Sequence, residues 1–312
     1  KKFVVVYLLS TQKEEIMKKP SKYWILAGTF FTSVSSIIIR FSEAPALVIS
    51  AYRMLFTCMM LFLPVYIKNR NEFKSLNKSN FIMCVISGIF LAFHFASWIK
   101  SIQMTTIANS TVLVSCSPIF VAAINYYLFK ERITYKMIVG ISMSLLGTII
   151  IGMGSSQGNE SSMMLGNILA FMGAIFVAGY LVIGGFVRRT VSAGVYVFIV
   201  YFVSAIVLFI MCFVTGIPVY PYPAKEYMLF FLLGFFSSIL GHTAYNYLMK
   251  YYSSTLISVS TLMEPIFASL MAMFIFSEIP SLYTVVGGII IIGGIYYYLM
   301  TQNTIKDNEK KI

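Results

Sequence analysis

A few ionisable and aromatic side chains stand inside long apolar stretches of this sequence. Glu264 lies about ten residues into one stretch, or roughly 15 Å along a helix that rises about 1.5 Å per residue. A carboxylate at the centre of a bilayer costs about 2.5 to 3.5 kcal/mol, and such residues usually face a cavity, pair with another group or relay protons. Because burial disfavours the charged form, Glu264 is a candidate for proton exchange. The alternative is a protonated Glu264 that hydrogen-bonds a neighbouring helix beside Pro265.

Arg53 is a second ionisable group inside an apolar stretch, about two turns from its start. One interpretation is that its side chain extends outward to the membrane surface. The other is that its guanidinium binds a substrate carboxylate or an acidic side chain. An ion pair between Arg53 and Glu264 is a further option that depends on their separation.

Two pairs of polar and aromatic residues complete the candidate binding residues. His94 and Trp98 are four residues apart, as are His242 and Asn246, so each pair shares one face of a helix. A ring nitrogen and an indole on one face suit a pocket for a small amino or aromatic solute. The alternative is a buried histidine in a polar contact between helices.

The sequence lacks the motifs of several other chemistries. The cysteines show no CxxC spacing and lie in apolar runs, which is typical of buried free thiols: Cys58, Cys84, Cys116 and Cys212. There is no G-x4-GK[ST] loop, no HExxH and no GxSxG. We therefore expect no metal, no cofactor and no catalytic residues, and hence no enzyme.

The composition indicates which solvent surrounds these residues. The chain has 312 residues, of which 59% are hydrophobic and 11% charged, with a mean hydropathy of +0.84. About a quarter of the residues of a soluble protein are charged, so the composition predicts a protein embedded in lipid.

Ten windows of about 20 apolar residues predict ten transmembrane helices, and hence an all-α polytopic membrane protein. The windows cover 22–41, 45–67, 81–102, 107–128, 134–152, 164–187, 192–215, 227–249, 254–276 and 281–300. The predicted organisation is an N-terminal arm (1–21), a five-helix repeat (22–152), a linker (153–163), a second five-helix repeat (164–300) and a tail (301–312). The apolar part of the arm is too short for a signal peptide.

The basic residues predict the orientation. With the N-terminus in the cytoplasm, all 23 lysines and arginines lie on the cytoplasmic side except Arg40, Arg53, Lys100 and Lys225, as the positive-inside rule requires. Both termini are then cytoplasmic, in the plasma or inner membrane. The net charge of +12 reflects this topology, and no nucleic-acid partner is expected.

Two segments of the chain repeat each other. VSCSPIFVAAINYYLFKE (114–131) and TLMEPIFASLMAMFIFSE (261–278) align at an offset of 147 residues, which is typical of an internal duplication. Because each half has five spans, an odd number, the second half enters the membrane from the opposite side. Such inverted repeats place a binding site near the midplane between the halves. Glu264 is aligned with Ser117, so a proton role would belong to the second half alone.

The repeat also duplicates prolines and glycines. Pro118 and Pro265 lie within their apolar windows and remove backbone hydrogen bonds, so we expect hinges for alternating access or, alternatively, static bends. Two pairs of glycines seven residues apart predict close helix packing, with a homodimer seam as an alternative: Gly140 with Gly147, and Gly287 with Gly294. Glu131 and its repeat partner Glu278 precede short turns, where they would stabilise the next helix.

These motifs together resemble the drug/metabolite transporter superfamily, and within it the EamA type with ten helices. The resemblance rests on Pro45 and Arg53, on Ala108, on SPIF…FKE and EPIF…FSE, and on the two spaced glycine pairs. It covers nearly the whole chain from Lys22 to Met300. The resemblance implies a carrier, and many such carriers export amino acids or other small metabolites, several of them with proton coupling.

The expected function is therefore a secondary active transporter that exports a small organic metabolite by alternating access. Its partners would be that substrate and the lipid bilayer, with a homodimer as an option. Two other classes stay open: a scaffold or receptor with a carrier fold, and a membrane enzyme that acts on a lipid-linked substrate.

Overall fold

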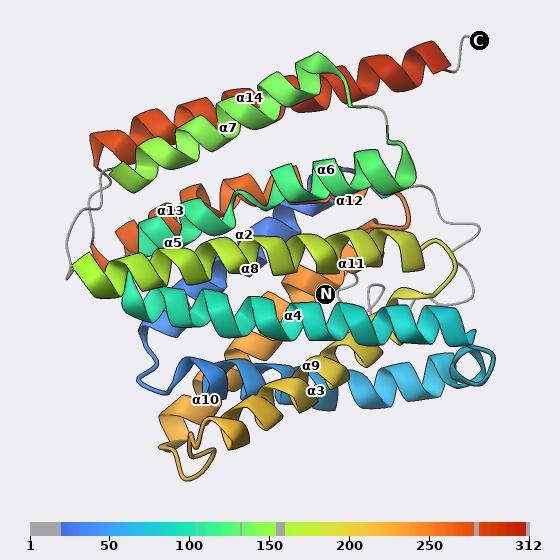
Figure 1. Ribbon diagram of the computed structural model, residues 1–312, viewed down its shortest axis with the longest axis vertical. Helices are drawn as coiled ribbons and strands as arrows, with labels where there is room; N and C mark the ends of the chain where they lie inside the picture. Colours follow the sequence, from blue (N-terminus) through green and yellow to red (C-terminus); the bar gives the residue numbers. More distant parts are fainter. Residues whose placement is uncertain (1–19, 106, 132, 154–159, 278–280, 310–312) are drawn as a thin grey trace.

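The computed structural model describes residues 20–105, 107–131, 133–153, 160–277 and 281–309, and every regular element in these ranges is a helix (Figure 1). The predicted all-α fold class is confirmed. Most of the predicted N-terminal arm, the middle of the predicted linker and Glu278 lie outside the described residues.

The first half of the chain supplies five spans. They are α2 (Tyr23–Arg40), α3 (Ala46–Lys74), α4 (Lys78–Met104), the pair α5 (Ile107–Val114) and α6 (Ser117–Phe129), and α7 (Tyr135–Met153). Helices α3 and α4 extend beyond their predicted windows at the basic connection, because charged and polar residues continue the helices past the apolar region.

The second half supplies the other five. They are α8 (Glu160–Val187), α9 (Ala193–Val214), the chain of α10 (Ala224–Leu232), η1 (Leu233–His242) and α11 (Thr243–Leu248), the chain of α12 (Ser254–Ser260), η2 (Thr261–Met263) and α13 (Glu264–Phe276), and α14 (Leu282–Glu309). Eight spans are at least 18 residues long and apolar enough to cross a membrane, and shorter apolar helices account for the remaining two.

The packing of the spans follows the repeat. Helix α2 packs against η1 of the eighth span, and α8, the counterpart of α2, packs against α4 of the third. Helices α3 and α9, which are counterparts, pack on each other, as do α7 and α14. If the two halves are exchanged, the contact of α2 with the eighth span becomes the contact of α8 with the third span. A pseudo-twofold relation between the halves requires this equivalence. Figure 1 shows α7 and α14 together at one edge of the molecule.

The duplicated glycines lie in the contact between α7 and α14. A Cβ atom on Gly140 would stand 2.9 Å from the carbonyl oxygen of Gly294, and one on Gly147 would stand 2.5 Å from that of Gly287. These pairings run in opposite directions along the two helices, so α7 and α14 are antiparallel. Their glycine faces are occupied within one chain, so they cannot also form the homodimer seam considered above.

The two repeated segments are broken helices rather than continuous kinked ones. Helix α5 ends at Val114 and α6 begins at Ser117, with Pro118 in its first turn. In the ninth span a short 3₁₀ turn separates α12 from α13, and Pro265 lies in the first turn of α13. A proline is well accommodated in the first turn because its missing N–H has no partner there. The interruption thus precedes each proline, whereas the sequence had suggested a bend within one helix.

The eighth span contains a ten-residue π-helix, η1. A Cβ atom on Gly234 would stand 3.1 Å from the carbonyl oxygen of Arg53, and one on Gly88 would stand 2.7 Å from that of Val200. These contacts are equivalent in the two halves, although the two glycines are 146 residues apart rather than 147. Between Gly234 and Tyr245 the second half therefore has one residue more than the first half has between Gly88 and Trp98. The wider π turns of η1 absorb this residue.

Candidate substrate-binding site

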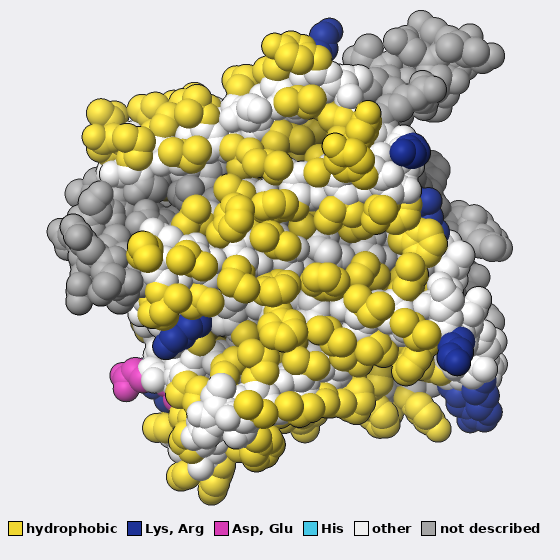
Figure 2. Space-filling view, in the orientation of Figure 1, with side chains coloured by type: hydrophobic (Ala, Val, Ile, Leu, Met, Phe, Trp, Pro, Cys, Tyr) yellow, Lys and Arg dark blue, Asp and Glu magenta, His cyan; other side chains and the backbone are white. Residues whose placement is uncertain are grey.

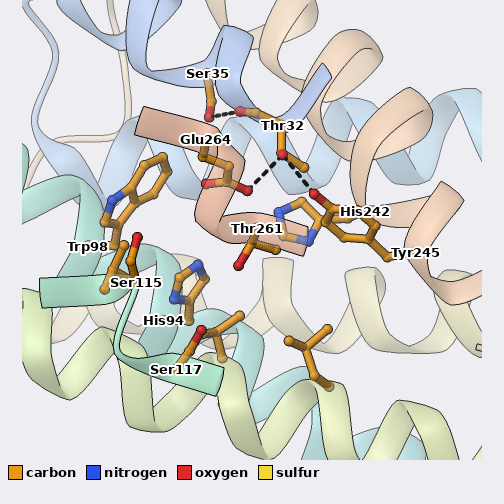
Figure 3. A pocket seen from close by; sticks show the side chains of 13 residues that line it. Thr32, Ser35, His94, Trp98, Ser115, Ser117, His242, Tyr245, Thr261 and Glu264 are labelled. Atoms are coloured by element: carbon orange, nitrogen blue, oxygen red, sulfur yellow. Dashed lines mark hydrogen bonds between the residues drawn. The ribbon is translucent and has the colours of Figure 1, made fainter. Parts of the chain in front are cut away.

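A cavity of about 50 Å³ lies in the middle of the bundle (Figure 3). It is lined by Thr32, Ser35, His94, Trp98, Val114, Ser115, Ser117, Val177, Leu181, His242, Tyr245, Thr261 and Glu264. These residues come from the first, third and fourth spans of the first half and from their counterparts in the second half. The cavity is thus the place where the two repeats meet.

Glu264 opens α13 and is the single charged residue among those that line the cavity. The Thr32 hydroxyl donates a hydrogen bond to its Oε1 at 2.8 Å. The same hydroxyl lies 3.1 Å from the Tyr245 hydroxyl, which lies 3.0 Å from Oγ1 of Thr29. No hydrogen bond to Oε2 of Glu264 is found among the described residues. A chain of hydroxyls therefore holds one oxygen of the carboxyl group and leaves the other free of hydrogen bonds from the described residues.

His94 and Trp98 lie together on one face of α4, with their rings stacked at a centroid distance of 5.9 Å. His94 Nδ1 is 3.0 Å from the carbonyl oxygen of Gly173. Since a carbonyl can only accept, Nδ1 carries the hydrogen, and Nε2 of the neutral ring is an acceptor. The indole Nε1 of Trp98 is buried without a hydrogen-bond partner. Among the described residues this N–H donor has no acceptor, which is unusual in a protein interior.

His242 lines the cavity, whereas Asn246, four residues further along the same span, does not. His242 lines the cavity, with Nδ1 buried and unpartnered. The Asn246 amide donates to the His242 carbonyl oxygen at 2.7 Å and to the Tyr180 hydroxyl. Asn246 thus ties the eighth span to α8 behind the cavity wall and does not line the cavity.

Arg53 also lies outside the set of residues that line the cavity. Its side chain is fully buried, so it does not extend to the membrane surface. Its Nε donates to Oγ of Ser238 at 2.9 Å, and its guanidinium carbon lies 4.1 Å from the centre of the Phe95 ring. The two terminal nitrogens have no hydrogen-bond partner, and no ion pair with Glu264 forms within 4 Å among the described residues. The stack on Phe95, a cation–π contact, offsets part of the cost of burying this charge.

Sequence reasoning missed Thr32 and Tyr245. Tyr245 is aligned with Trp98 at the repeat offset of 147 residues, so the alignment already contained the signal that it faces the same cavity. Thr32 carries no such signal, because threonine is common in membrane helices as a hydrogen-bonding residue. Ser117, the counterpart of Glu264, lines the cavity as well.

The two ends of the bundle differ. We call the end where α3 finishes and α4 begins the basic end; Figure 2 shows most exposed lysines and arginines along that side. A second cavity of about 370 Å³ lies at the basic end, between Glu131, Arg189 and Lys250. Glu131 there accepts a hydrogen bond from Thr255 at 3.0 Å, joining the end of α6 to the start of α12.

Repeat-related phenylalanines stand at the two ends. Phe129 is at the basic end, where the guanidinium carbon of Arg189 is 5.8 Å from its ring centre. Phe276 is at the opposite end, where that of Arg40 is only 4.2 Å away. The aromatic–cation contact is therefore tight at the Arg40 end and loose beside the larger cavity.

A model of the EamA-like transporter family matches residues 20–153 and 164–300. The chain belongs to this family. The two matched segments of the EamA-like chain correspond to the two sets of five spans, and the protein is a multi-pass membrane protein of the drug/metabolite transporter type.

Relatives of this EamA-like chain carry transporter names. It is 24% identical over 221 residues to an uncharacterized transporter of Archaeoglobus fulgidus, covering 70% of this chain and 75% of the relative. It is 22% identical over 280 residues to the pseudopaline exporter CntI of Pseudomonas aeruginosa, covering 89% of this chain and 95% of that protein. A solved crystal structure with 14% identity superposes with a TM-score of 0.70 over 89% of this chain and 95% of its own. These names point to transport rather than catalysis, and the superposition supports the fold.

Proposed function

We propose that this protein is a secondary active transporter that exports a small organic metabolite, such as an amino acid, by alternating access. The observation that carries the proposal is the central cavity, in which one carboxyl group is enclosed by three spans from each half. A site between inverted repeats is accessible from either side of the membrane when the halves rock against each other. The relative named as an exporter favours the outward direction.

Glu264 is the proposed proton carrier. Among the described residues that line the cavity it is the only one with a carboxyl group, and it is held by a hydroxyl rather than by a cation. A carboxyl group that is not locked in a direct ion pair can lose its proton to one side and regain it from the other. A unit charge that crosses the membrane gains about 2.3 kcal/mol per 100 mV, enough to drive appreciable export.

The two ends and the broken spans support alternating access. The Arg40–Phe276 contact is tight at one end, whereas a larger cavity lies beside Phe129 at the other, and this difference between the ends is what two alternating states require. The interruptions before Pro118 and Pro265 allow the outer and inner parts of the fourth and ninth spans to move separately. With the basic end in the cytoplasm, both termini are cytoplasmic and the larger cavity lies on the cytoplasmic side.

Reconstitution into proteoliposomes that enclose a pH-sensitive dye tests the proposal. Addition of a mixture of amino acids should move protons across the membrane with the unmodified protein and not with Glu264→Gln. Binding without any proton or substrate flux would support a receptor instead. Substrate flux with unchanged pH dependence in Glu264→Gln would remove the proton role and leave the transporter standing.

A further inference from the structure

The central cavity presents two hydrogen-bond acceptors to a ligand. Glu264 contributes the unpartnered Oε2, and His94 contributes Nε2, because its Nδ1 donates to Gly173. Both groups accept hydrogen bonds when Glu264 is ionised and His94 is neutral. A ligand group with several N–H donors and a positive charge satisfies both acceptors at once, and an ammonium group has three such donors.

The walls of the cavity fit the same charge. Trp98 and Tyr245 occupy equivalent positions in the two repeats and both line the cavity. Aromatic rings attract a cation that lies within about 6 Å of the ring centre, and tryptophan is the strongest of them. An anionic ligand would meet the Glu264 carboxylate, and the nearest guanidinium, that of Arg53, lies outside the cavity wall.

The size of the cavity limits what enters this part of the site. Its volume of about 50 Å³ corresponds to a few water molecules, given that one needs roughly 10 to 15 Å³ of such space. A compact headgroup fits, whereas a phosphate or sugar group would require the spans to separate. The unpartnered Trp98 N–H, in a side chain only 7% exposed, is then available to an oxygen atom of the ligand.

We propose that the central cavity binds the ammonium group of a small organic amine, with Glu264 and His94 Nε2 as its acceptors and Trp98 and Tyr245 as its aromatic walls. This assignment rests on the proposed transport function and specifies the part of the substrate that the site recognises. Carboxylate recognition by Arg53 is not required.

Trp98 itself provides the assay. The chain has two tryptophans, so Trp24→Phe leaves Trp98 as the only source of tryptophan emission. The purified full chain with this substitution is titrated with three ligands that share one alkyl chain: isopentylamine, isopentanol and 4-methylpentanoate. We expect isopentylamine to change the emission at a concentration at least about tenfold lower than the other two, since a charge-assisted hydrogen bond contributes this much to affinity.

The matched variants are Glu264→Gln and Glu43→Gln, which remove one carboxylate inside the cavity and one on an exposed connection. Glu264→Gln should weaken the binding of isopentylamine at least about tenfold, and Glu43→Gln should leave it unchanged. Because the ligand comparison needs no substitution in the cavity carboxylate, it stands even if Glu264→Gln does not fold.

Three outcomes would overturn the assignment: tightest binding of 4-methylpentanoate, equal binding of all three ligands, or no emission change with any of them. Each is separable from failure of the proposed function, because proton and substrate flux in proteoliposomes is measured independently. If amino acids produce flux but isopentylamine does not bind, the ammonium site is wrong and the transport function stands. If isopentylamine binds but no flux occurs, the ammonium site stands and the transport function is wrong.

Discussion

The two halves of this protein are built alike and differ at the positions that carry charge. Ser117 and Glu264 both begin the second part of a broken span, and both line the central cavity. Only Glu264 is ionisable. The repeat therefore supplies a symmetric container, and the difference between Ser117 and Glu264 places an ionisable group on one side of it. In a transporter with one proton site, this arrangement avoids a second buried carboxylate, whose charge would repel the first.

A second difference lies in the aromatic walls. Trp98 lies within the regular α-helix α4, whereas Tyr245 lies in α11 directly after the π-helix η1, which takes up one additional residue. The π-helix ends at His242 and lets that ring reach the cavity one position away from the place equivalent to His94. π-helical segments are often found at functional sites. Here His242 lies one residue beyond the position aligned with His94, while Tyr245 keeps the position aligned with Trp98.

The largest expected effect is the difference in flux between substitutions at Glu264 and at Ser117. Loss of a charged hydrogen-bonding group costs about 1.5 to 3 kcal/mol, so Glu264→Gln should lower proton-coupled flux roughly 10- to 100-fold. Ser117→Ala should change it less than about twofold, because no hydrogen bond of the Ser117 hydroxyl is found among the described residues. The measurement is initial flux in proteoliposomes as a function of pH. Equal losses in both variants would show that the charge asymmetry of the halves has no functional meaning.

The next effect concerns stability and compares two glycines of α14. Gly287→Ala places a methyl group against the carbonyl oxygen of Gly147, whereas Gly293 has no other group within 4 Å of the added atom. Overpacking costs about 1 to 3 kcal/mol, so Gly287→Ala should lower the thermal unfolding midpoint. Gly293→Ala should leave it unchanged or raise it, since alanine favours helix by up to about 1 kcal/mol. Equal midpoints would contradict the close α7/α14 contact.

The fold could be predicted from the sequence because its two strongest signals are local. Apolar windows define the spans, and the repeated segments 114–131 and 261–278 define the halves. Breaks before Pro118 and Pro265 could not be located, since proline is compatible with both a bend within a helix and the first turn of a new one. The π-helix was also missed, because one inserted residue in an apolar stretch leaves the hydropathy pattern unchanged.

The site could be predicted only in part. Glu264, His94, Trp98 and His242 stand out because they are polar or large residues in apolar surroundings, and the structure brings them to one cavity. The position of Arg53 could not be inferred, because its partner Ser238 comes from a span 185 residues away. Which polar groups meet across helices depends on how the helices rotate against each other, and hydropathy does not report this rotation.

A smaller effect compares the two aromatic walls. Tyr245→Phe removes a hydroxyl that lies within 3.1 Å of Thr32 and 3.0 Å of Thr29, which should cost about 1 kcal/mol of stability. Trp98→Phe removes an N–H that has no partner among the described residues, but it also shrinks a buried ring stacked on His94, so it should lower the thermal midpoint through lost packing and also lower the affinity for isopentylamine. Thermal unfolding measures the stability of both variants, and calorimetric titration with isopentylamine measures their affinity, because Trp98→Phe removes the fluorescent side chain. An unchanged affinity for isopentylamine in Trp98→Phe would contradict the assignment of this ring to the wall of the ligand site.

The smallest effect compares the two ends. A cation–π contact contributes about 0.5 to 1 kcal/mol, so Phe276→Leu should shift the population toward a state open at the Arg40 end by roughly two- to fivefold. Phe129→Leu should shift it less, because Arg189 lies 5.8 Å from that ring while Arg40 lies 4.2 Å from the other. A Ser35→Cys substitution in the cavity wall reports the state through its rate of labelling by an impermeant maleimide added on the side of the Arg40 end.

Phe276→Leu should raise that labelling rate relative to the protein carrying Ser35→Cys alone, and Phe129→Leu should leave it nearly unchanged. The native cysteines, three of which are buried, are accounted for by labelling the protein without Ser35→Cys. Equal rates in the two phenylalanine variants would mean that the Phe276 contact does not keep the Arg40 end closed. Closure at that end would then depend on the packing of α2 against α13, and the structural difference between the two ends would carry no energetic bias.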